Sequence, residues 1–351
     1  MKISYMLKRE SFYEINEKTL GAYYHGQGKQ KKLYIYPELN AIVTARPSKK
    51  VKKYLYTEYR VSGSLLRRIA VRLYAGVMLN SCGLFASKKI KINTSADKNT
   101  LIYPCNKKYR IFDFENNTVS VTPKYGFPTG DLDNEIAFRS QNDADFIPKL
   151  ALFSDNGYTE AIIDGYPIAR AGERQAELCD RAYNIWKSYI GGSLEKIPSV
   201  RYAQILEDEL SSIINKLTEL KKDVDIFLLR SVMDSVLSDL RANDCEIEVG
   251  LSHGDLQSGN IWVERGTDKI YIIDWESYGK RSVYYDKAAL YDNIRKKEGV
   301  RLYMKERDTV HSTVLAEDII FRTKELLNLP ENFGTDAVNE FLFELKGERN
   351  V

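Results

Sequence analysis

Two neighbouring segments, Leu251–Val263 (LSHGDLQSGNIWV) and Ile270–Glu276 (IYIIDWE), carry the strongest structural signal in this chain of 351 residues. The apolar end of the first segment and the apolar beginning of the second predict two strands joined by a short turn. Such a hairpin places Asp274, at the end of its second strand, beside the loop that holds Asp255 and Asn260. The polar side chains of the two segments are therefore expected to converge.

These side chains suit a hard divalent cation. A carboxylate beside a carboxamide, facing a second carboxylate across a hairpin, forms an oxygen-rich site that fits magnesium better than zinc. Glu276 points the same way along the strand as Asp274. A contact with metal or substrate and a structural hydrogen bond are both open for Glu276. His253 is expected to fix the loop by hydrogen bonding.

The pattern H-x-D-x-x-x-x-N, with an acid after a hairpin, resembles the aminoglycoside phosphotransferase and choline kinase family, relatives of the eukaryotic protein kinases. The resemblance implies a two-lobed, protein-kinase-like α+β fold with a small antiparallel-sheet lobe and a mainly helical large lobe. It implies transfer of the γ-phosphate of ATP, with Mg²⁺, to a hydroxyl of a small molecule or glycan. Asp255 would orient and help deprotonate that hydroxyl, Asn260 would bind one magnesium ion, and Asp274 would bridge magnesium and the phosphates.

The same resemblance implies a nucleotide site in the small lobe. Lys124, at the end of the predicted strand TVSVTPK, matches the lysine that holds the α and β phosphates. Glu135, on the next predicted helix, matches the ion-pair partner of that lysine; a solvated surface pair is the alternative. Glu160, Ala161 and Ile162 lie in YTEAIIDG, which resembles the hinge whose backbone amide and carbonyl hold adenine.

Glycine-rich phosphate loops do not occur in the sequence. Neither G-x-G-x-x-G nor G-x-x-x-x-G-K-[ST] is present, so a Rossmann site and a Walker loop have no support. The turn that covers the phosphates would be Pro104–Lys108, whose amides and lysines can face phosphate without glycine; an exposed basic hairpin end is the alternative. Gly254 occupies the position where the protein kinases have arginine, which favours a kinase of small molecules over a protein kinase. Asp286 resembles a structural aspartate that orders the metal-binding loop.

Composition divides the chain into three regions. Residues 1–95 are expected to form a basic extension of unknown role, residues 96–166 the small nucleotide-binding lobe and hinge, and residues 167–351 the helical catalytic and acceptor-binding lobe. The first hundred residues hold twenty Lys or Arg against six Asp or Glu. This asymmetry indicates contact with something anionic: a membrane surface, a nucleic acid, or the acidic remainder of the same protein.

A basic amphipathic helix is predicted over Ser64–Leu79. It places four apolar residues on one face: Leu66, Ile69, Leu73 and Val77. Docking on its own protein and contact with an anionic membrane are both open for this helix, and no nucleic acid partner is expected. The four scattered cysteines form no C-x-x-C pair, which is typical of reduced thiols in a cytoplasmic protein; membrane contact would place the protein at the inner face.

Three rival functions remain from the residues alone. A protein kinase needs a long activation segment, but Asp286 follows Asp274 by only twelve residues. A nucleotide-binding pseudokinase or scaffold would lose a catalytic residue, and none is missing. A metal-dependent phosphoesterase would need several histidines near paired metals, whereas this chain has three, far apart. The sequence does not name the acceptor among sugars, amino-alcohols and envelope glycan precursors, and it leaves the oligomeric state open.

Overall fold

The computed structural model describes residues 9–58, 65–154 and 157–349, and the chain divides into two compact units. The first unit comprises Met1–Thr129 and Lys149–Ile163, and the second comprises Gly130–Pro148 and Asp164–Val351. The boundary expected near residue 166 therefore lies close to an observed one. The boundary expected at residue 95 is not where the chain divides.

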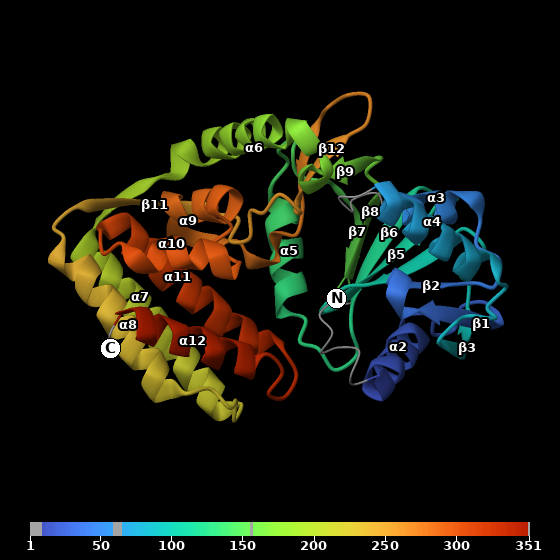
Figure 1. The fold of residues 1–351 in the computed structure, drawn as a ribbon, viewed down its shortest axis with the longest axis horizontal. Coiled ribbons are helices and arrows are strands. Elements are labelled where there is room, and N and C mark those ends of the chain that lie inside the picture. Colours follow the sequence, from blue (N-terminus) through green and yellow to red (C-terminus); the bar gives the residue numbers. More distant parts are fainter. Residues whose placement is uncertain (1–8, 59–64, 155–156, 350–351) are drawn as a thin grey trace. The chain divides into compact units, whose positions relative to one another are not determined.

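In the described part of the first unit, eight strands form one antiparallel sheet in the order β3-β1-β2-β4-β5-β6-β8-β7 (Figure 1). Along β3 the buried positions alternate with exposed lysines, which is the pattern of a strand with one covered face. The strands are β1 (Lys29–Tyr36), β2 (Ala41–Val43), β3 (Lys88–Thr94), β4 (Thr100–Pro104), β5 (Lys108–Asp113), β6 (Thr118–Pro123), β7 (Leu150–Ser154) and β8 (Gly157–Ala161).

The region before position 95 contributes three strands to this sheet, so its described part is not a separate extension. Strands β1, β2 and β3 come from that region, and β2 pairs with β4 through Ile42 and Ile102. Composition suggested a boundary because most exposed positions of β1 and β3 are lysines, but buried apolar residues of the same two strands share one core.

Helices cover both faces of the sheet. Helix α2 (Arg9–Tyr23) packs Leu20 against one face, in a cluster with Ile42 and Tyr109. Helices α3 (Lys49–Glu58) and α4 (Leu65–Asn80) cover the other face, where Leu55 and Leu79 pack with residues of β4, β5 and β6. Ser64 of the predicted amphipathic helix lies outside the described residues, as does the side chain of Leu66.

The second unit is mainly helical. In α7 the buried residues Tyr202, Leu206, Leu210 and Leu217 recur at three- to four-residue spacing and build one core with the neighbouring helices. The α-helices are α5 (Gly130–Gln141), α6 (Gln175–Ile190), α7 (Ser199–Glu219), α8 (Ile226–Ala242), α9 (Val283–Lys287), α10 (Lys297–Lys305), α11 (Thr309–Glu325) and α12 (Thr335–Arg349).

Within its described residues, the second unit also contains two three-stranded sheets, ordered β10-β11-β14 and β13-β12-β9. The predicted hairpin is confirmed, because β12 pairs antiparallel with β13 through Val263 and Ile270. The strands are β9 (Gly165–Pro167), β10 (Glu195–Pro198), β11 (Glu246–Ser252), β12 (Ile261–Glu264), β13 (Ile270–Ile272) and β14 (Gly279–Ser282). The α+β class, with an antiparallel-sheet part and a helical part, is therefore confirmed.

None of the four cysteines is in a disulfide bond. Among the described residues, no helix combines the length and apolar character needed to cross a bilayer.

Candidate active site

The loop that carries Asp255 begins at the end of β11 and is fixed by the buried carboxylate of Asp286. The Asp286 carboxylate accepts hydrogen bonds from the backbone N–H groups of His253 (2.9 Å) and Gly254 (3.1 Å). It also accepts from the hydroxyl of Ser252 and from the indole N–H of Trp186. Asp286 thus orders this loop, and not the metal-binding loop as the family resemblance suggested.

His253 joins the Asp255 loop to the end of the hairpin. Its Nε2 lies 3.0 Å from the carbonyl oxygen of Ile273, and its Nδ1 accepts the backbone N–H of Asp255 at 3.2 Å. With Nδ1 accepting, the proton is on Nε2 and is donated to Ile273. His253 is fully buried, so its role is to hold the two segments together, as the sequence predicted.

Gly254 allows the two segments to approach closely. Its φ of +80° lies in the left-handed region, and a Cβ at this position would come within 2.1 Å of the carbonyl oxygen of Ser277. Only glycine fits here, since the obstacle is backbone. The glycine that replaces the arginine of protein kinases therefore has a structural reason in this chain.

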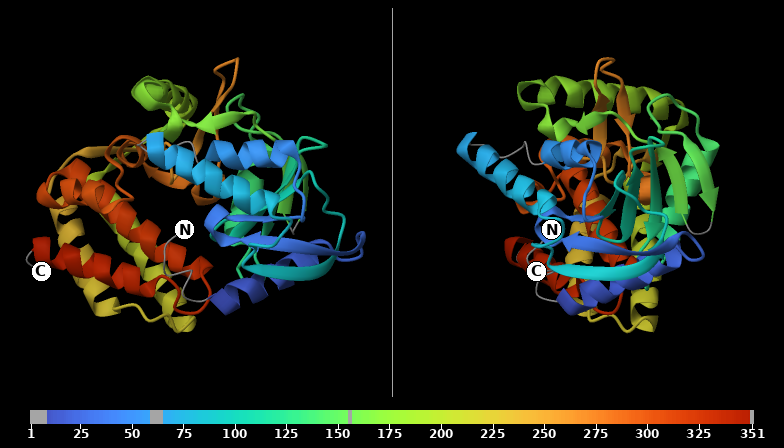
Figure 2. Two further views of the ribbon diagram at one scale, coloured as in Figure 1. Left: turned by 45° about the vertical axis from the view of Figure 1, so that its right-hand side comes forward. Right: turned by 90° about the vertical axis from the view of Figure 1, so that its right-hand side faces the viewer.

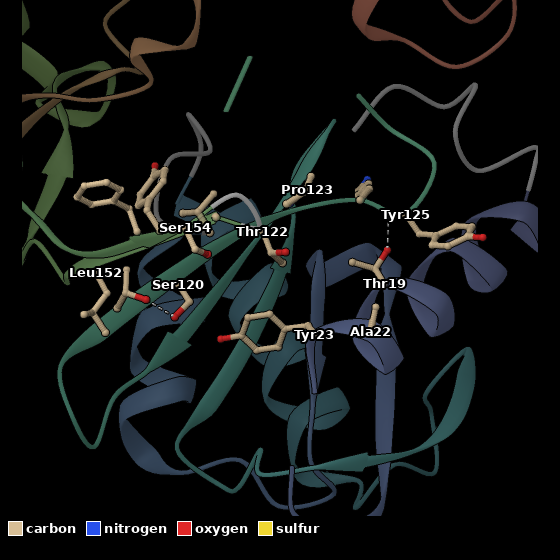
Figure 3. Close-up of a pocket in the computed structure, with 15 residues that line it drawn as sticks. Thr19, Ala22, Tyr23, Ser120, Thr122, Pro123, Tyr125, Leu152 and Ser154 are labelled. Carbon is tan, nitrogen blue, oxygen red and sulfur yellow. Dashed lines mark hydrogen bonds between the residues drawn. The ribbon is translucent and has the colours of Figure 1, made fainter. Parts of the chain in front are cut away.

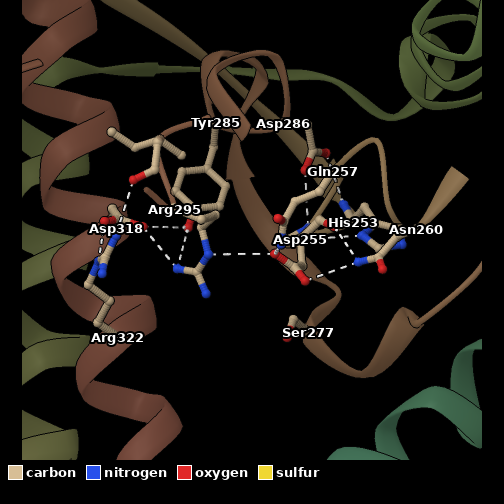
Figure 4. Close-up of polar contacts among 12 residues, drawn as sticks. His253, Asp255, Gln257, Asn260, Ser277, Tyr285, Asp286, Arg295, Asp318 and Arg322 are labelled. Atoms are coloured by element: carbon tan, nitrogen blue, oxygen red, sulfur yellow. Dashed lines mark hydrogen bonds and ion pairs between the residues drawn. The ribbon is translucent and has the colours of Figure 1, made fainter. Parts of the chain in front are cut away.

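Asp255 and Asn260 are in direct contact. The Asn260 side-chain amide donates to the Asp255 carboxylate (3.0 Å) and to the Asp255 carbonyl oxygen (2.9 Å), as Figure 4 shows. Because the N–H groups of this amide face Asp255, its oxygen is directed away and is available to a cation. The backbone N–H of Ile273 donates to the Asn260 carbonyl at 2.9 Å, which ties Asn260 to the segment of Asp274.

Two further residues hold the Asp255 carboxylate, and the sequence analysis missed both. Gln257, two residues along the loop, donates its amide to Asp255, and the Arg295 guanidinium lies 3.5 Å from the same carboxylate oxygen (Figure 4). Arg295 also pairs with Asp318 at 2.9 Å and stacks over the ring of Phe321. Gln257 could have been noticed from its position, whereas nothing in the sequence connects Arg295 to a loop forty residues away.

Three carboxylates gather where the segment after β13 meets helix α5. Oxygen atoms of Glu135, Asp274 and Glu276 lie within 4.8 Å of one another, with Glu135 fully buried. Helix α5 brings Glu135 here because Phe138 stacks on Trp275 at 4.4 Å and Asn134 donates to the Glu276 carbonyl at 2.8 Å. Carboxylate oxygens at this density fit a hard divalent cation such as magnesium.

Glu135 was expected to be the ion-pair partner of Lys124. Helix α5 belongs to the second unit, whereas Lys124 belongs to the first. The Glu135 carboxylate makes a buried ion pair with Arg139, one turn along the helix, at 3.1 Å. Sequence analysis did not single out Arg139, although the i,i+4 spacing of an acid and a base on a helix is a usable signal. The expected ion pair with Lys124 stays a prediction.

Lys124 follows β6 and is buried in aromatic surroundings. Its Nζ lies 5.5 Å from the centre of the Tyr109 ring and 5.9 Å from that of Phe127. Burial lowers the pKa of Lys124 to about 8. The turn expected to cover the phosphates is the β4–β5 hairpin end, where the Cys105 amide donates to the Lys108 carbonyl and is therefore used within the turn.

A cavity of about 510 Å³ opens in the first unit and includes Lys124 in its lining. Figure 3 shows hydroxyl groups around it: Ser120 and Thr159 are joined by a hydrogen bond of 2.9 Å, and Thr19 of α2 accepts the backbone N–H of Tyr125. This volume lies in the range of small-molecule sites in proteins. A lysine beside several hydroxyl groups can hold an anionic ligand such as a phosphate.

The segment expected to hold adenine lies at the end of β8. Glu160, Ala161 and Ile162 do not belong to the lining of this cavity, and Glu160 is buried. The Ile162 amide donates to the Asn117 carbonyl at 3.0 Å, so that amide is not available to a base. Since backbone groups alternate along a strand, those of Ala161 point to the other side and remain candidates.

Comparison with known proteins adds to this geometry. Residues 201–309 match the model of the phosphotransferase enzyme family. The match covers Asp255, Asn260 and Asp274, and leaves out Lys124 and Glu135. It confirms the resemblance on which the sequence analysis relied, and with it the phosphotransferase class of enzyme. No curated protein is similar enough in sequence to match this chain.

Solved structures with distant likeness are small-molecule kinases by their descriptions. A choline/ethanolamine kinase family protein from Mesorhizobium loti is 12% identical, with 71% of this chain and 90% of that chain covered and a TM-score of 0.46. Plasmodium vivax ethanolamine kinase is 15% identical, with 90% and 97% covered and a TM-score of 0.43. Aminoglycoside phosphotransferase APH(2'')-Ib is 12% identical, with 70% and 90% covered and a TM-score of 0.43. Because these scores lie below 0.5, the phosphotransferase match and the site geometry alone bear on the function.

Proposed function

We propose that this phosphotransferase moves the γ-phosphate of ATP, with magnesium, to a hydroxyl group of a small molecule or glycan. The observation that carries the proposal is the pairing of Asp255 with Asn260 on a loop that is bonded through its backbone to the segment of Asp274. A base, a carboxamide oxygen and a carboxylate held together in this way match the needs of phosphoryl transfer, which depends on positioning and charge neutralisation.

Each side chain has a role in this scheme. Asn260 and Asp274 would hold magnesium, and the carboxylates of Glu135 and Glu276 are near enough to Asp274 to join them. The bound ion would neutralise charge on the phosphates. Lys124 would offset further phosphate charge, in keeping with its place on the lining of a cavity of suitable volume.

Asp255 would act on the acceptor. As the new bond forms between the acceptor oxygen and the γ-phosphorus and the bond to the ADP oxygen breaks, the hydroxyl proton passes to the Asp255 carboxylate. Its contacts with Gln257, Asn260 and Arg295 fix the orientation of that carboxylate. Orienting the hydroxyl is therefore as much a part of its role as accepting the proton.

Replacing Asp255 tests this role. Asp255→Ala should lower kcat by about 10²- to 10⁴-fold, the usual contribution of a general base, and should leave the Kd for Mg²⁺–nucleotide within about threefold of the unchanged chain. Turnover is measured as ADP release and nucleotide binding by calorimetry. Full turnover in Asp255→Ala would exclude the role, whereas loss of nucleotide binding would point to a fault in folding.

The acceptor is to be found by screening. ATP consumption measured across sugars, amino-alcohols and envelope glycan precursors should rise for one class and should disappear in Asp255→Ala. If nucleotide binds but no acceptor raises ATP consumption above the Asp255→Ala background, a nucleotide-binding scaffold becomes the better account.

A further inference from the structure

Helix α4 exposes several large apolar residues along one side. Ile69, Leu73 and Val77 are 47%, 67% and 58% exposed, while Ala75 is fully buried against the sheet of the first unit. The three exposed residues are spaced four positions apart and so lie along one side of the helix. The outward side of a helix in a water-soluble protein is usually polar, whereas this outward side of α4 is apolar. Figure 2 shows α4 reaching outward from the strands.

Basic residues border this apolar side. A groove of about 540 Å³ is lined by Lys49, Lys52 and Lys53 of α3 together with Arg72 and Leu73 of α4. A hydrogen bond of 2.6 Å from Lys52 to Asn80 holds the two helices together. The sequence of α4 contains no Asp or Glu, and that of α3 contains only one, at its last position. The name α3–α4 surface is used below for Ile69, Leu73 and Val77 with Lys49, Lys52, Lys53 and Arg72.

We propose that the α3–α4 surface binds the face of an anionic lipid bilayer. Ile69, Leu73 and Val77 would enter the boundary between headgroups and acyl chains, and the lysines and Arg72 would meet the anionic headgroups. An apolar side bordered by lysine and arginine is the pattern of helices that lie in a membrane interface. Contact at the interface also agrees with the finding that no helix among the described residues could span a bilayer.

Charge complementarity favours a bilayer over other occupants. A symmetric contact between two copies of this chain would bring two basic surfaces together, at an electrostatic cost. A nucleic acid would satisfy the lysines but leave three exposed apolar side chains with no complementary partner, because phosphate contacts are polar. An anionic bilayer offers both a charged layer and an apolar one, and so matches both parts of the surface.

The bilayer proposal is independent of the proposed phosphotransfer. The α3–α4 surface lies in the first unit and contains none of the residues assigned to chemistry or to nucleotide binding. A chain with Asp255→Ala should therefore bind vesicles like the unchanged chain. Surface variants should keep their turnover in solution, so failure of either proposal can be recognised separately.

Vesicle co-sedimentation of the full chain tests the proposal. The unchanged chain should bind vesicles of phosphatidylglycerol and phosphatidylcholine at least tenfold more tightly than vesicles of phosphatidylcholine alone, and the binding should weaken as salt is raised from about 0.05 to 0.5 M. The double variant Leu73→Glu/Val77→Glu and the double variant Lys49→Glu/Lys53→Glu should each lose at least tenfold in affinity. Because these side chains are exposed, thermal melts should stay unchanged.

Matched controls come from the second unit. Phe343→Glu on α12 changes an apolar residue that is 72% exposed, and Lys187→Glu on α6 reverses an exposed charge; neither should alter vesicle binding. The proposal is overturned if phosphatidylglycerol does not increase binding, or if the controls weaken it as much as the surface variants do. It is also overturned if light scattering shows a dimer that Leu73→Glu/Val77→Glu dissociates, or if only duplex DNA binds to the surface.

Discussion

Lys124 combines a cationic group with a buried, aromatic environment. Burial lowers its pKa to about 8, which leaves the amine mostly charged at neutral pH and mostly neutral above pH 9. A charged amine attracts phosphate and a neutral one does not. The charge of Lys124 therefore changes between pH 7 and pH 9, a range in which binding can be measured.

Nucleotide affinity should follow the titration of Lys124. The Kd for Mg²⁺–AMP-PNP should increase by about tenfold as the pH rises from 7 to 9, because the positive charge is lost. Lys124→Arg keeps its charge over this range, so its affinity should be almost independent of pH. Calorimetric titrations at several pH values measure both chains. An equal pH dependence in Lys124→Arg would show that another group is responsible.

Most residues of the candidate active site could be predicted from the sequence. His253, Asp255 and Asn260 are close in the chain and next to a strand, so their convergence follows from local geometry. Arg295 could not be expected, because its contact with Asp255 depends on the path of the chain between β14 and α10. The segment that contains Ile162 was expected to hold adenine through its backbone, and only the structure shows that the amide of Ile162 donates to Asn117.

At the scale of single elements, the Asp255 loop depends on Asp286 of the short helix α9. Asp286→Asn keeps the size of the side chain but replaces one acceptor oxygen with an amide NH2 group, which cannot accept, so part of the set of four hydrogen bonds is lost. The free energy of unfolding should fall by about 2–4 kcal/mol. Turnover should fall as well, while Asp286 itself touches no substrate. Urea unfolding and steady-state rates measure the two effects, and a fully active, fully stable Asp286→Asn chain would contradict the account.

Helix α11 carries a buried acid that should make stability depend on pH. Burial raises the pKa of Glu317 to about 7, and its carboxylate accepts hydrogen bonds from Ser282 and Tyr202. The folded state therefore holds a proton that the unfolded state releases near pH 4.5. The stability that this proton provides is fully present below pH 4.5 and is lost as the pH rises through 7.

Glu317→Gln removes the titration and keeps the shape of the side chain. Between pH 4.5 and 7.5 the unchanged chain should lose about 3 kcal/mol in unfolding free energy through this group. The Glu317→Gln chain should show a flatter curve over the same range. Urea unfolding at pH 5, 6 and 7.5 gives the comparison. Parallel curves for the two chains would assign the pH dependence to other groups.

Helix α5 shows which part of an element's structure can be predicted from the sequence and which part cannot. The sequence predicted a helix that contains Glu135, and the structure has one over Gly130–Gln141. Its packing was not predictable, because the apolar residue that decides it, Phe138, finds Trp275 more than a hundred residues away. Glu135 consequently lies with Asp274 and Glu276 and pairs with Arg139.

At the scale of the whole molecule, composition did not predict where the chain divides into its two units. The excess of lysine and arginine before residue 95 predicted a separate extension, but alternate residues of β1 and β3 are buried in the core of the sheet. Charged residues indicate which positions of the two strands are exposed, and they do not show which strands share a core. The antiparallel-sheet part, the helical part and the β12–β13 hairpin could be predicted, because they depend on local periodicity and on one strong motif.

The central claim is that Asp274, with Asn260, holds a divalent ion against the nucleotide. Calorimetric binding of AMP-PNP with and without Mg²⁺ tests it without any knowledge of the acceptor. In the unchanged chain and in Asp255→Ala, Mg²⁺ should tighten binding by at least tenfold; in Asp274→Ala the two affinities should be equal. A full Mg²⁺-dependent gain in a correctly folded Asp274→Ala chain would contradict the claim.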